Sequence, residues 1–500
     1  MTKNIIANFF GKFWSVFSNF IFIPLYIKFL GFENYSIVSF TLVIAGLMAI
    51  LDGGLTATLS REFARNDQSI LDKILVFKTL EKIYIGISLF SIVLTVFLSS
   101  IIASNFANSI SIEGNELTRL LQIVSFDIGF QLLMRFYIGG FLGLEKHMKA
   151  NVIQIIWGVM RNGFVIIVIL LSPSLESFFI WQSVITVFFS CITGYLIRNE
   201  LGINFEIRSI FVIEKRVVLR LWRFASGMLL ISIVSALNTQ MDKVAISKFL
   251  PLKSLGYYTV AISIGMSILV LVNPISTALL PRLTSLFSAG RTVEAKKLYQ
   301  KVNLFVSIIV FSVMAGVSVF AYELLLLWTG SNDVALNSQN IVPYVSFSFV
   351  MLSLAMIPFN IAIANGYTML NNVLGVVSLL ITLPGYWFVT KKYGAVGAAF
   401  VYCIVQTMIT MVYIYVINNK FFKNINFNSL FIKPIVFPFV ISTAIALLVK
   451  FVTNNLFINN FLMVIVICFT VLFSVFASVL ILFSRSELDS IKMNFTIFKK

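Results

Sequence analysis

Fourteen apolar runs, each about as long as a membrane-spanning helix, divide this sequence from one end to the other. A helix needs about 20 mainly apolar residues to cross the hydrocarbon core of a bilayer. The runs cover residues 7–30, 35–58, 80–104, 118–143, 150–171, 176–197, 223–247, 256–280, 302–326, 341–364, 371–390, 396–418, 432–451 and 460–484. This pattern predicts an all-α polytopic membrane protein with about 14 transmembrane helices.

The composition agrees with this fold class. Hydrophobic residues make up 59% of the 500 residues, charged residues make up 11%, and the mean hydropathy is +0.98. No soluble domain needs so much apolar surface. The formal net charge of +17 would suit nucleic acid, but the basic residues lie between the apolar runs, as membrane topology requires. We therefore expect a lipid bilayer as partner and no nucleic acid.

The distribution of lysine and arginine predicts the orientation. With the N-terminus inside, the inner segments hold 27 of the 37 basic residues and the outer segments hold 8. The remaining two, Arg135 and Arg161, lie inside predicted helices. Because basic residues collect in cytoplasmic loops, we expect both termini in the cytoplasm.

An internal repeat with an offset of about 221 residues relates the two halves of the sequence. The tripeptide Lys-Phe-Leu at 28–30 returns at 248–250, and Asn-Val at 151–152 returns at 372–373. Each half has six predicted helices, so both have the same orientation, with a substrate path between them. The predicted parts are an N-terminal six-helix lobe at 1–200, a cytoplasmic linker at 201–222, a C-terminal six-helix lobe at 223–425, and two extra transmembrane helices with a cytoplasmic tail at 426–500.

Three charged side chains lie well inside the fourth and fifth predicted helices. A charge near the bilayer centre costs at least about 2.5–3.5 kcal/mol, so such residues face a bundle interior or a watery cavity. Asp127, Gln131 and Arg135 are spaced four apart on one broad helix face, and Gln154 and Arg161 share a face of the next helix. They form either a polar lumen or an Asp–Arg pair that only holds helices together. Arg161 has no acidic residue within one turn on its own helix, so we expect its charge to be uncompensated.

Asp52 and Asp242 join Asp127 as candidates for ion coupling or gating. Asp52 precedes a Gly-Gly pair, and its repeat counterpart is the Asn-Pro pair at 273–274. Both dipeptides loosen a helix, either where backbone lines a cavity or as ordinary kinks. Asp242 lies beside Lys243, so an interfacial ion pair competes with a coupling role.

Arg61 and Arg282 occupy equivalent positions at the inner edge of the two halves. They are either ordinary positive-inside anchors or phosphate ligands, since guanidinium binds phosphate in a bidentate manner. The sequence contains no P-loop, no HExxH motif, no nucleophile elbow and no Cys/His cluster. We therefore expect no catalytic residue, no cofactor and no metal site, and a secondary transporter rather than an enzyme.

Four segments point to a known family. They read LDGGLTATLSREFAR at 51–65, GLEKHMKANVIQIIWGVMRNG at 143–163, LWRFASGMLLISIVSALNTQMDKVAISKFLPLKSLGYYTVA at 221–261, and NGYTMLNNVLGVV followed by PGYWFVTKKYGAVGAA within 365–399. Together they resemble the polysaccharide flippase family, the Wzx-type transporters of O-antigen and capsule units, within the superfamily that includes multidrug MATE exporters.

The resemblance implies two MATE-like lobes around a cationic cavity, and two extra helices. It implies that an undecaprenyl-pyrophosphate-linked oligosaccharide moves from the inner to the outer leaflet of a bacterial cytoplasmic membrane. On this reading Arg135 and Arg161 attract the pyrophosphate, and Asp127 orients them or takes a proton. The coupling ion would be a proton or sodium, and a polysaccharide polymerase is a candidate partner.

Two other functions stay open. A MATE-type small-molecule exporter needs only twelve helices and usually takes cationic substrates, which an arginine-lined cavity repels. A membrane glycosyltransferase or polymerase would be expected to place acidic residues or a sizeable domain in an outer loop, and the predicted outer loops are short.

Overall fold

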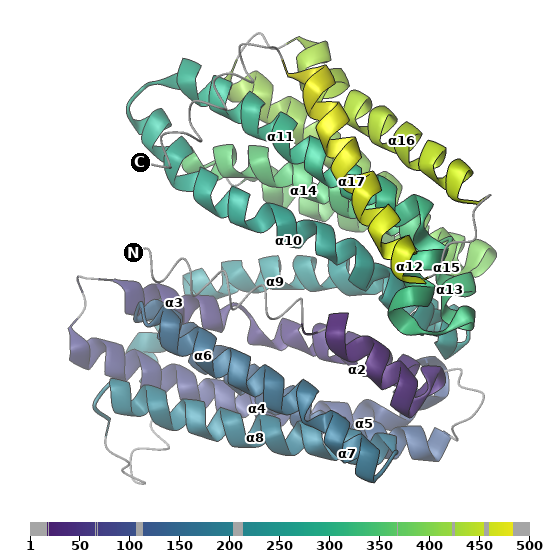
Figure 1. The fold of residues 1–500 in the computed structure, drawn as a ribbon. Coiled ribbons are helices and arrows are strands. Elements are labelled where there is room, and N and C mark those ends of the chain that lie inside the picture. The colour runs from purple at the N-terminus through teal and green to yellow at the C-terminus, as the bar shows by residue number, and fades with distance from the viewer. Residues whose placement is uncertain are drawn as a thin grey trace. The chain divides into compact units, whose positions relative to one another are not determined.

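The computed structural model describes residues 18, 20–65, 67, 69–106, 114–203, 214–367, 369–422, 426–454 and 460–483. Every regular element in this part of the chain is a helix (Figure 1), which confirms the all-α prediction. After a short helix at Phe20–Leu30, the elements are α2 (Phe32–Met48), η1 (Ala49–Asp52), α3 (Leu55–Ala64), α4 (Ile70–Phe106), α5 (Gly114–Gly143), α6 (His147–Gly158), η2 (Val159–Gly163), α7 (Val165–Leu171), α8 (Leu175–Glu200), α9 (Lys215–Phe249), α10 (Leu252–Ser288), α11 (Thr292–Val319), α12 (Ala321–Thr329), α13 (Asn332–Ser338), α14 (Val342–Ala364), α15 (Met369–Phe421), η4 (Asn428–Val436), α16 (Phe437–Thr453) and α17 (Asn460–Leu482).

Twelve helices among the described residues are long and apolar enough to cross a membrane. Two predicted spans, 371–390 and 396–418, lie in the single long element α15, which has a non-helical residue between them at Gly394. The predicted span 7–30 lies partly outside the described residues. The structure thus confirms a polytopic membrane protein, and the count of fourteen stays a prediction.

The chain forms two compact units. Unit 1 contains residues 1–259 and 379–398, and unit 2 contains residues 260–378 and 399–500. Helices α10 and α15 contribute to both units. The two parallel repeats and their boundaries stay predictions.

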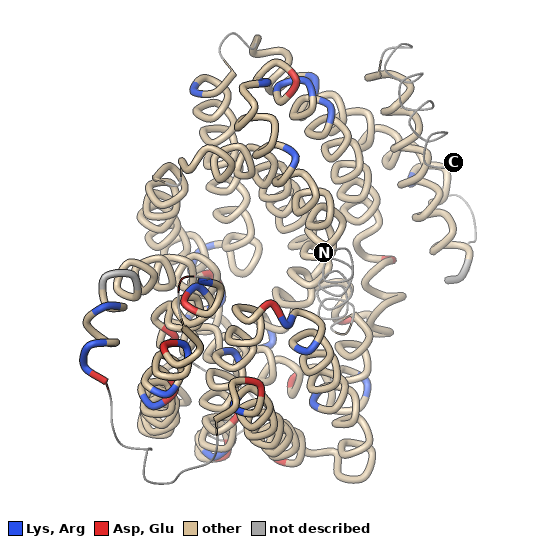
Figure 2. The backbone as a smooth tube through the Cα atoms, turned by 90° about the vertical axis from the view of Figure 1, so that its left-hand side faces the viewer, with Lys and Arg blue, Asp and Glu red and all other residues tan. Residues whose placement is uncertain are grey.

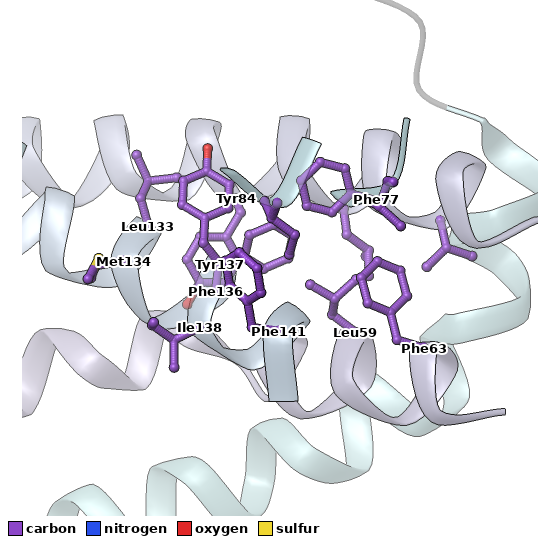
Figure 3. Packing of buried hydrophobic residues seen from close by; sticks show 14 of the residues in the cluster. Leu59, Phe63, Phe77, Tyr84, Leu133, Met134, Phe136, Tyr137, Ile138 and Phe141 are labelled. Atoms are coloured by element: carbon purple, nitrogen blue, oxygen red, sulfur yellow. The ribbon is translucent and has the colours of Figure 1, made fainter. Parts of the chain in front are cut away.

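In unit 1, helix α5 packs against α3, α4 and α8. Aromatic rings fill the space between these helices (Figure 3), with Phe136 stacked on Tyr84 and on Phe77 at centroid distances of 4.6 and 6.0 Å. Small residues let the backbones approach, because a Cβ atom on Gly143 would lie 2.6 Å from the carbonyl oxygen of Ser60 in α3. The close fit of α5 determines which of its side chains point into the unit and which point out.

The predicted second span is bent at its Gly-Gly pair. Gly53 and Gly54 have φ angles of 55° and 74°, a left-handed conformation that glycine adopts without steric cost. Helix α2 therefore ends, and α3 starts in a new direction. Helix α9 packs into the bend so closely that a Cβ atom on Gly54 would lie 2.1 Å from the Cβ atom of Met228.

The corresponding Asn-Pro pair at 273–274 behaves differently. Helix α10 continues from Leu252 to Ser288 with Pro274 inside it, so the expected loosening does not end this helix. A proline removes only one hydrogen bond and can be accommodated as a kink, whereas two consecutive left-handed residues cannot belong to a right-handed helix.

In unit 2, helix α11 packs against α14, α16 and α17. Leu304 and Ile308 of α11 meet Leu482 and Phe483 in a small buried cluster at one end of α17. The side-chain amide of Asn360 in α14 donates to the carbonyl and the hydroxyl oxygen of Ser276 in α10, at 2.8 and 2.9 Å. The helices after residue 426 thus pack directly on the core of unit 2.

We predict that Gly54→Ala lowers the thermal stability of the purified protein more than Gly202→Ala does. Both glycines have φ near 70°, where a non-glycine residue costs about 1–3 kcal/mol, but only Gly54 has a neighbour in the path of the new methyl group. The melting temperature in detergent measures the difference. Equal losses in the two variants would show that the contact with α9 does not restrain the bend.

Candidate functional site

Asp127 lies at the centre of a buried polar cluster in unit 1. Its carboxylate accepts hydrogen bonds from Arg161 Nη2 at 2.7 Å and from Arg161 Nε at 3.3 Å. Gln131 Nε2 donates to it at 2.8 Å and Thr186 Oγ1 at 2.6 Å. Four donors from α5, η2 and α8 therefore surround one carboxylate, and both charged side chains are buried.

The guanidinium group of Arg161 is equally well satisfied. Besides the contacts with Asp127, it donates to Gln182 Oε1 and to Asn162 Oδ1, both at 3.0 Å. Its carbon atom lies 5.6 Å from the ring centroid of Trp157. Five donors in a fixed plane need several partners when buried, and this site supplies them from two helices.

A π-helical turn, η2, places Arg161 in this position. The amide of Phe164 bonds to the carbonyl of Val159, five residues back. Two other carbonyls of the turn accept side-chain bonds, Met160 from Trp181 Nε1 at 2.9 Å and Asn162 from the Tyr26 hydroxyl at 2.6 Å. Single π-turns of this kind occur frequently at functional sites.

The expectation that Arg161 carries an uncompensated charge is wrong, because it forms an ion pair with Asp127. Among the described residues, Asp127 makes no ion pair with Arg135. At 3.6 residues per turn, Gln131 is rotated by about 40° from Asp127, and Arg135 by about 80°. The first angle allows a side-chain contact, whereas the second directs Arg135 out of the cluster.

Arg135 is exposed, although it lies about 12 Å from the C-terminal end of α5. It lies close enough to the Tyr84 hydroxyl to interact with it electrostatically. Tyr84 in turn donates to a carboxylate oxygen of Asp52, which also accepts from the Thr56 hydroxyl. Asp52 and Arg135 therefore both interact with Tyr84, whereas Asp127 and Arg161 pair with each other.

Asp52 also has a structural role at the bend. Its carboxylate accepts from the backbone amides of Gly54 and Thr56, at 3.2 and 3.4 Å. These are unpaired amides at the start of α3, where a negative side chain is favourable. Unlike Asp127, Asp52 is only half-buried.

Asp242 is buried between α9 and α10. It accepts from the Tyr258 hydroxyl at 2.7 Å and from the backbone amide of Lys243 at 2.8 Å. The ammonium group of Lys243 lies 3.5 Å from the same carboxylate. The ion pair considered for this position is therefore present.

The remaining candidates are all exposed. Arg61 is exposed at the end of α3, and Arg282 is exposed on α10. Gln154 is exposed on α6 and makes no hydrogen bond to the Asp127 cluster among the described residues. Those residues also include no group of three or more His, Cys, Asp or Glu that could hold a metal ion.

The sequence did not single out Gln182 and Thr186, which complete the Asp127 cluster. A signal was present in α8, where four buried polar residues follow a helical spacing of four, four and three: Gln182, Thr186, Ser190 and Thr193. A polar stripe along an otherwise apolar helix indicates a face that packs against polar partners. No comparable sequence signal marks Tyr84. Its hydroxyl bonds to Asp52 because the bend at Gly53 and Gly54 sets the position of that carboxylate.

Residues 1–287 match the model of a family described as polysaccharide biosynthesis protein. The chain belongs to this family. It is also 22% identical over 376 residues to a putative O-antigen transporter of Shigella flexneri, covering 74% of this chain and 86% of that protein.

Two solved structures have a similar fold. A lipid II flippase, MurJ, in an inward closed conformation aligns with a TM-score of 0.73 at 16% identity, covering 96% of this chain and 99% of that one. An inward-facing multidrug resistance MATE family transporter of the MOP superfamily aligns with a TM-score of 0.61 at 12% identity, covering 81% and 94%. Since these relatives are transporters, the prediction of a membrane transporter rather than an enzyme is confirmed.

We predict that Arg161→Gln destabilises the protein strongly, by about 3–5 kcal/mol, because it leaves the Asp127 carboxylate buried without its counter-charge. The double variant Asp127→Asn/Arg161→Gln should recover much of this loss, since both charges are then removed. Melting temperatures of the two single variants and the double variant measure the coupling. If the losses of stability in the two single variants add up to the loss in the double variant, the interaction between Asp127 and Arg161 does not stabilise the protein.

Proposed function

We propose that this protein is a flippase for oligosaccharides linked to undecaprenyl pyrophosphate, in the synthesis of O-antigen or capsular polysaccharide. The family match and the Shigella relative support the substrate class. The fold shared with a lipid II flippase is consistent with it. The proposed location is the bacterial cytoplasmic membrane, with both termini in the cytoplasm.

The observation that carries the proposal is the exposed guanidinium of Arg135 within a membrane-spanning helix. An arginine at that depth is too costly in lipid, so we infer that it faces a water-filled path. Guanidinium is the side chain best suited to bind a pyrophosphate by paired hydrogen bonds. The lipid tail of the substrate can stay in the bilayer while its polar head crosses along this path.

The two acidic residues of unit 1 receive different proposed roles. Asp52 is half-buried and bonded to Tyr84, which also interacts with Arg135, so Asp52 is the better candidate for a coupling proton or sodium ion. Asp127 is closed off by Arg161, Gln131 and Thr186, which suits a structural role. Alternating access would come from rocking of the two predicted lobes. Arg61 and Arg282 are proposed as contacts at the cytoplasmic entrance.

We predict that Arg135→Ala slows transport about tenfold or more, as expected for the loss of charge-assisted hydrogen bonds, without lowering the melting temperature. Arg135→Lys should keep part of the activity, because it retains the charge but not the planar fork. The assay reconstitutes the full chain in vesicles and follows a fluorescent sugar on undecaprenyl pyrophosphate by its accessibility to an impermeant quencher.

Arg119→Ala is the matched control, because Arg119 lies on the same helix, near the N-terminal end of α5. Its guanidinium is already paired with Glu176 at 2.7 Å. This variant should transport normally. Normal transport by Arg135→Ala would show that Arg135 does not bind the substrate along a transport path. Export of an organic cation such as ethidium, with no movement of the lipid, would favour a small-molecule exporter instead.

We predict that single cysteines at positions 73, 216 and 492 are labelled only from the cytoplasm, and those at 115 and 337 only from outside. The reason is the asymmetry of basic residues between alternate loops. Labelling with a membrane-impermeant maleimide in intact cells, compared with permeabilised cells, gives the result. Protection of position 115 in intact cells would reverse the proposed orientation of the first half.

A further inference from the structure

Several basic residues at the predicted inner ends of unit 1 have carboxylate partners. Arg198 lies 2.9 Å from Glu81, and Lys146 lies 2.9 Å from Glu200, which also pairs with Lys149. On the loop after α3, Arg65 donates two hydrogen bonds to Asp67 and lowers the pKa of that carboxyl to about 2. The positive-inside rule explains the number of cations here, and ion pairing neutralises many of them.

Unit 2 has a different balance of acidic and basic side chains. Its described residues carry only three acidic side chains, and two of these, Glu323 and Asp333, follow the far end of α11. The third, Glu294, is held by Arg291 in a bidentate pair with both distances 2.6 Å. At this end, the described basic residues are Arg282, Arg291, Lys296, Lys297, Lys301, Lys420 and Lys433. Acidic positions are correspondingly sparse in unit 2 in Figure 2.

Two of these lysines lie on a cluster of aromatic rings at the ends of four helices. Phe422 stacks on Tyr299 of α11 at 5.5 Å and on Phe287 of α10 at 5.9 Å. Phe421 contacts Phe287 and also Tyr367, which follows α14, at 6.2 Å each. We call these five rings the aromatic floor.

The two lysines contact neutral groups of the floor. Lys420 places its ammonium nitrogen 3.3 Å above the centroid of the Tyr367 ring. Lys296 donates to the backbone carbonyl of Phe422 at 3.5 Å. A ring face and a carbonyl hold a lysine in position but leave its full positive charge for an anion. The site therefore combines fixed cations with a rigid apolar base.

We propose that Lys296 and Lys420, on the aromatic floor, bind the phosphate of an anionic phospholipid from the leaflet at this end of unit 2. The floor lies at the ends of the membrane-spanning helices α10, α11, α14 and α15, at the depth where aromatic residues and headgroups meet. Basic sites between such helix ends bind anionic headgroups, and each lysine contributes about fivefold to affinity. This inference does not depend on the transported substrate.

The test titrates the purified full chain in neutral detergent with dioctanoyl phosphatidylglycerol or dioctanoyl phosphatidylcholine, and counts bound lipid by native mass spectrometry. The variant Lys296→Gln/Lys420→Gln should lose about 25-fold in affinity for phosphatidylglycerol at low salt, with phosphatidylcholine unchanged. Lys146→Gln/Lys149→Gln is the control, because it makes the same change of charge at two lysines that already form ion pairs with Glu200. It should bind phosphatidylglycerol as the wild type does.

Two further variants test the floor itself. Tyr367→Leu removes the ring beneath Lys420 and should weaken phosphatidylglycerol binding, whereas Tyr367→Phe keeps the ring and should bind normally. An unchanged melting temperature shows that each variant is folded.

Three outcomes would overturn the inference. The first is unchanged binding in the Lys296/Lys420 variant, and the second is an equal loss in the control pair. The third is displacement of phosphatidylglycerol by equimolar inorganic pyrophosphate, which would assign the site to a soluble phosphate instead of a membrane lipid.

Discussion

A carboxylate buried within a membrane domain must be neutralised and fully hydrogen-bonded, and Asp127 meets both conditions. Removing two charges from water costs several kcal/mol for each ion, so the pair persists only where geometry offsets that cost. Here Arg161 supplies two donors, and Gln131 and Thr186 supply the others. The requirement links α5, η2 and α8, and together with close contacts such as that between Gly143 and Ser60 it fixes the rotation of α5 about its own axis. The exposure of Arg135 follows from that rotation.

Much of the fold could be predicted from the sequence because its causes are local. Apolar runs of sufficient length require helices in a bilayer, where every backbone group must be satisfied internally. The bend at Gly53 and Gly54 follows from the conformational freedom of glycine. The contact of Asp127 with Gln131 follows from a spacing of four on a regular helix.

The partner of Asp127 could not be predicted in the same way. Helical spacing suggested Arg135 on the same broad face, but the pairing is made across helices, by a residue 34 positions away. Arg161 also lies in a π-turn, where the extra residue changes the direction of every later side chain relative to a regular helix. Spacing on one helix says nothing about rotation relative to its neighbours. That rotation depends on close contacts such as the one between Gly143 and Ser60.

The pairing has a consequence for the proposed transport. A carrier must bind its substrate firmly enough to capture it and weakly enough to release it on the other side. Two free arginines within one membrane domain would hold a pyrophosphate too strongly, since Coulomb attraction is large where the dielectric constant is low. With Arg161 neutralised by Asp127, unit 1 offers the exposed side chain of Arg135, about 12 Å from the C-terminal end of a membrane-spanning helix. On the proposed function, the buried ion pair thus serves transport indirectly, by keeping one of the two intramembrane arginines out of the path.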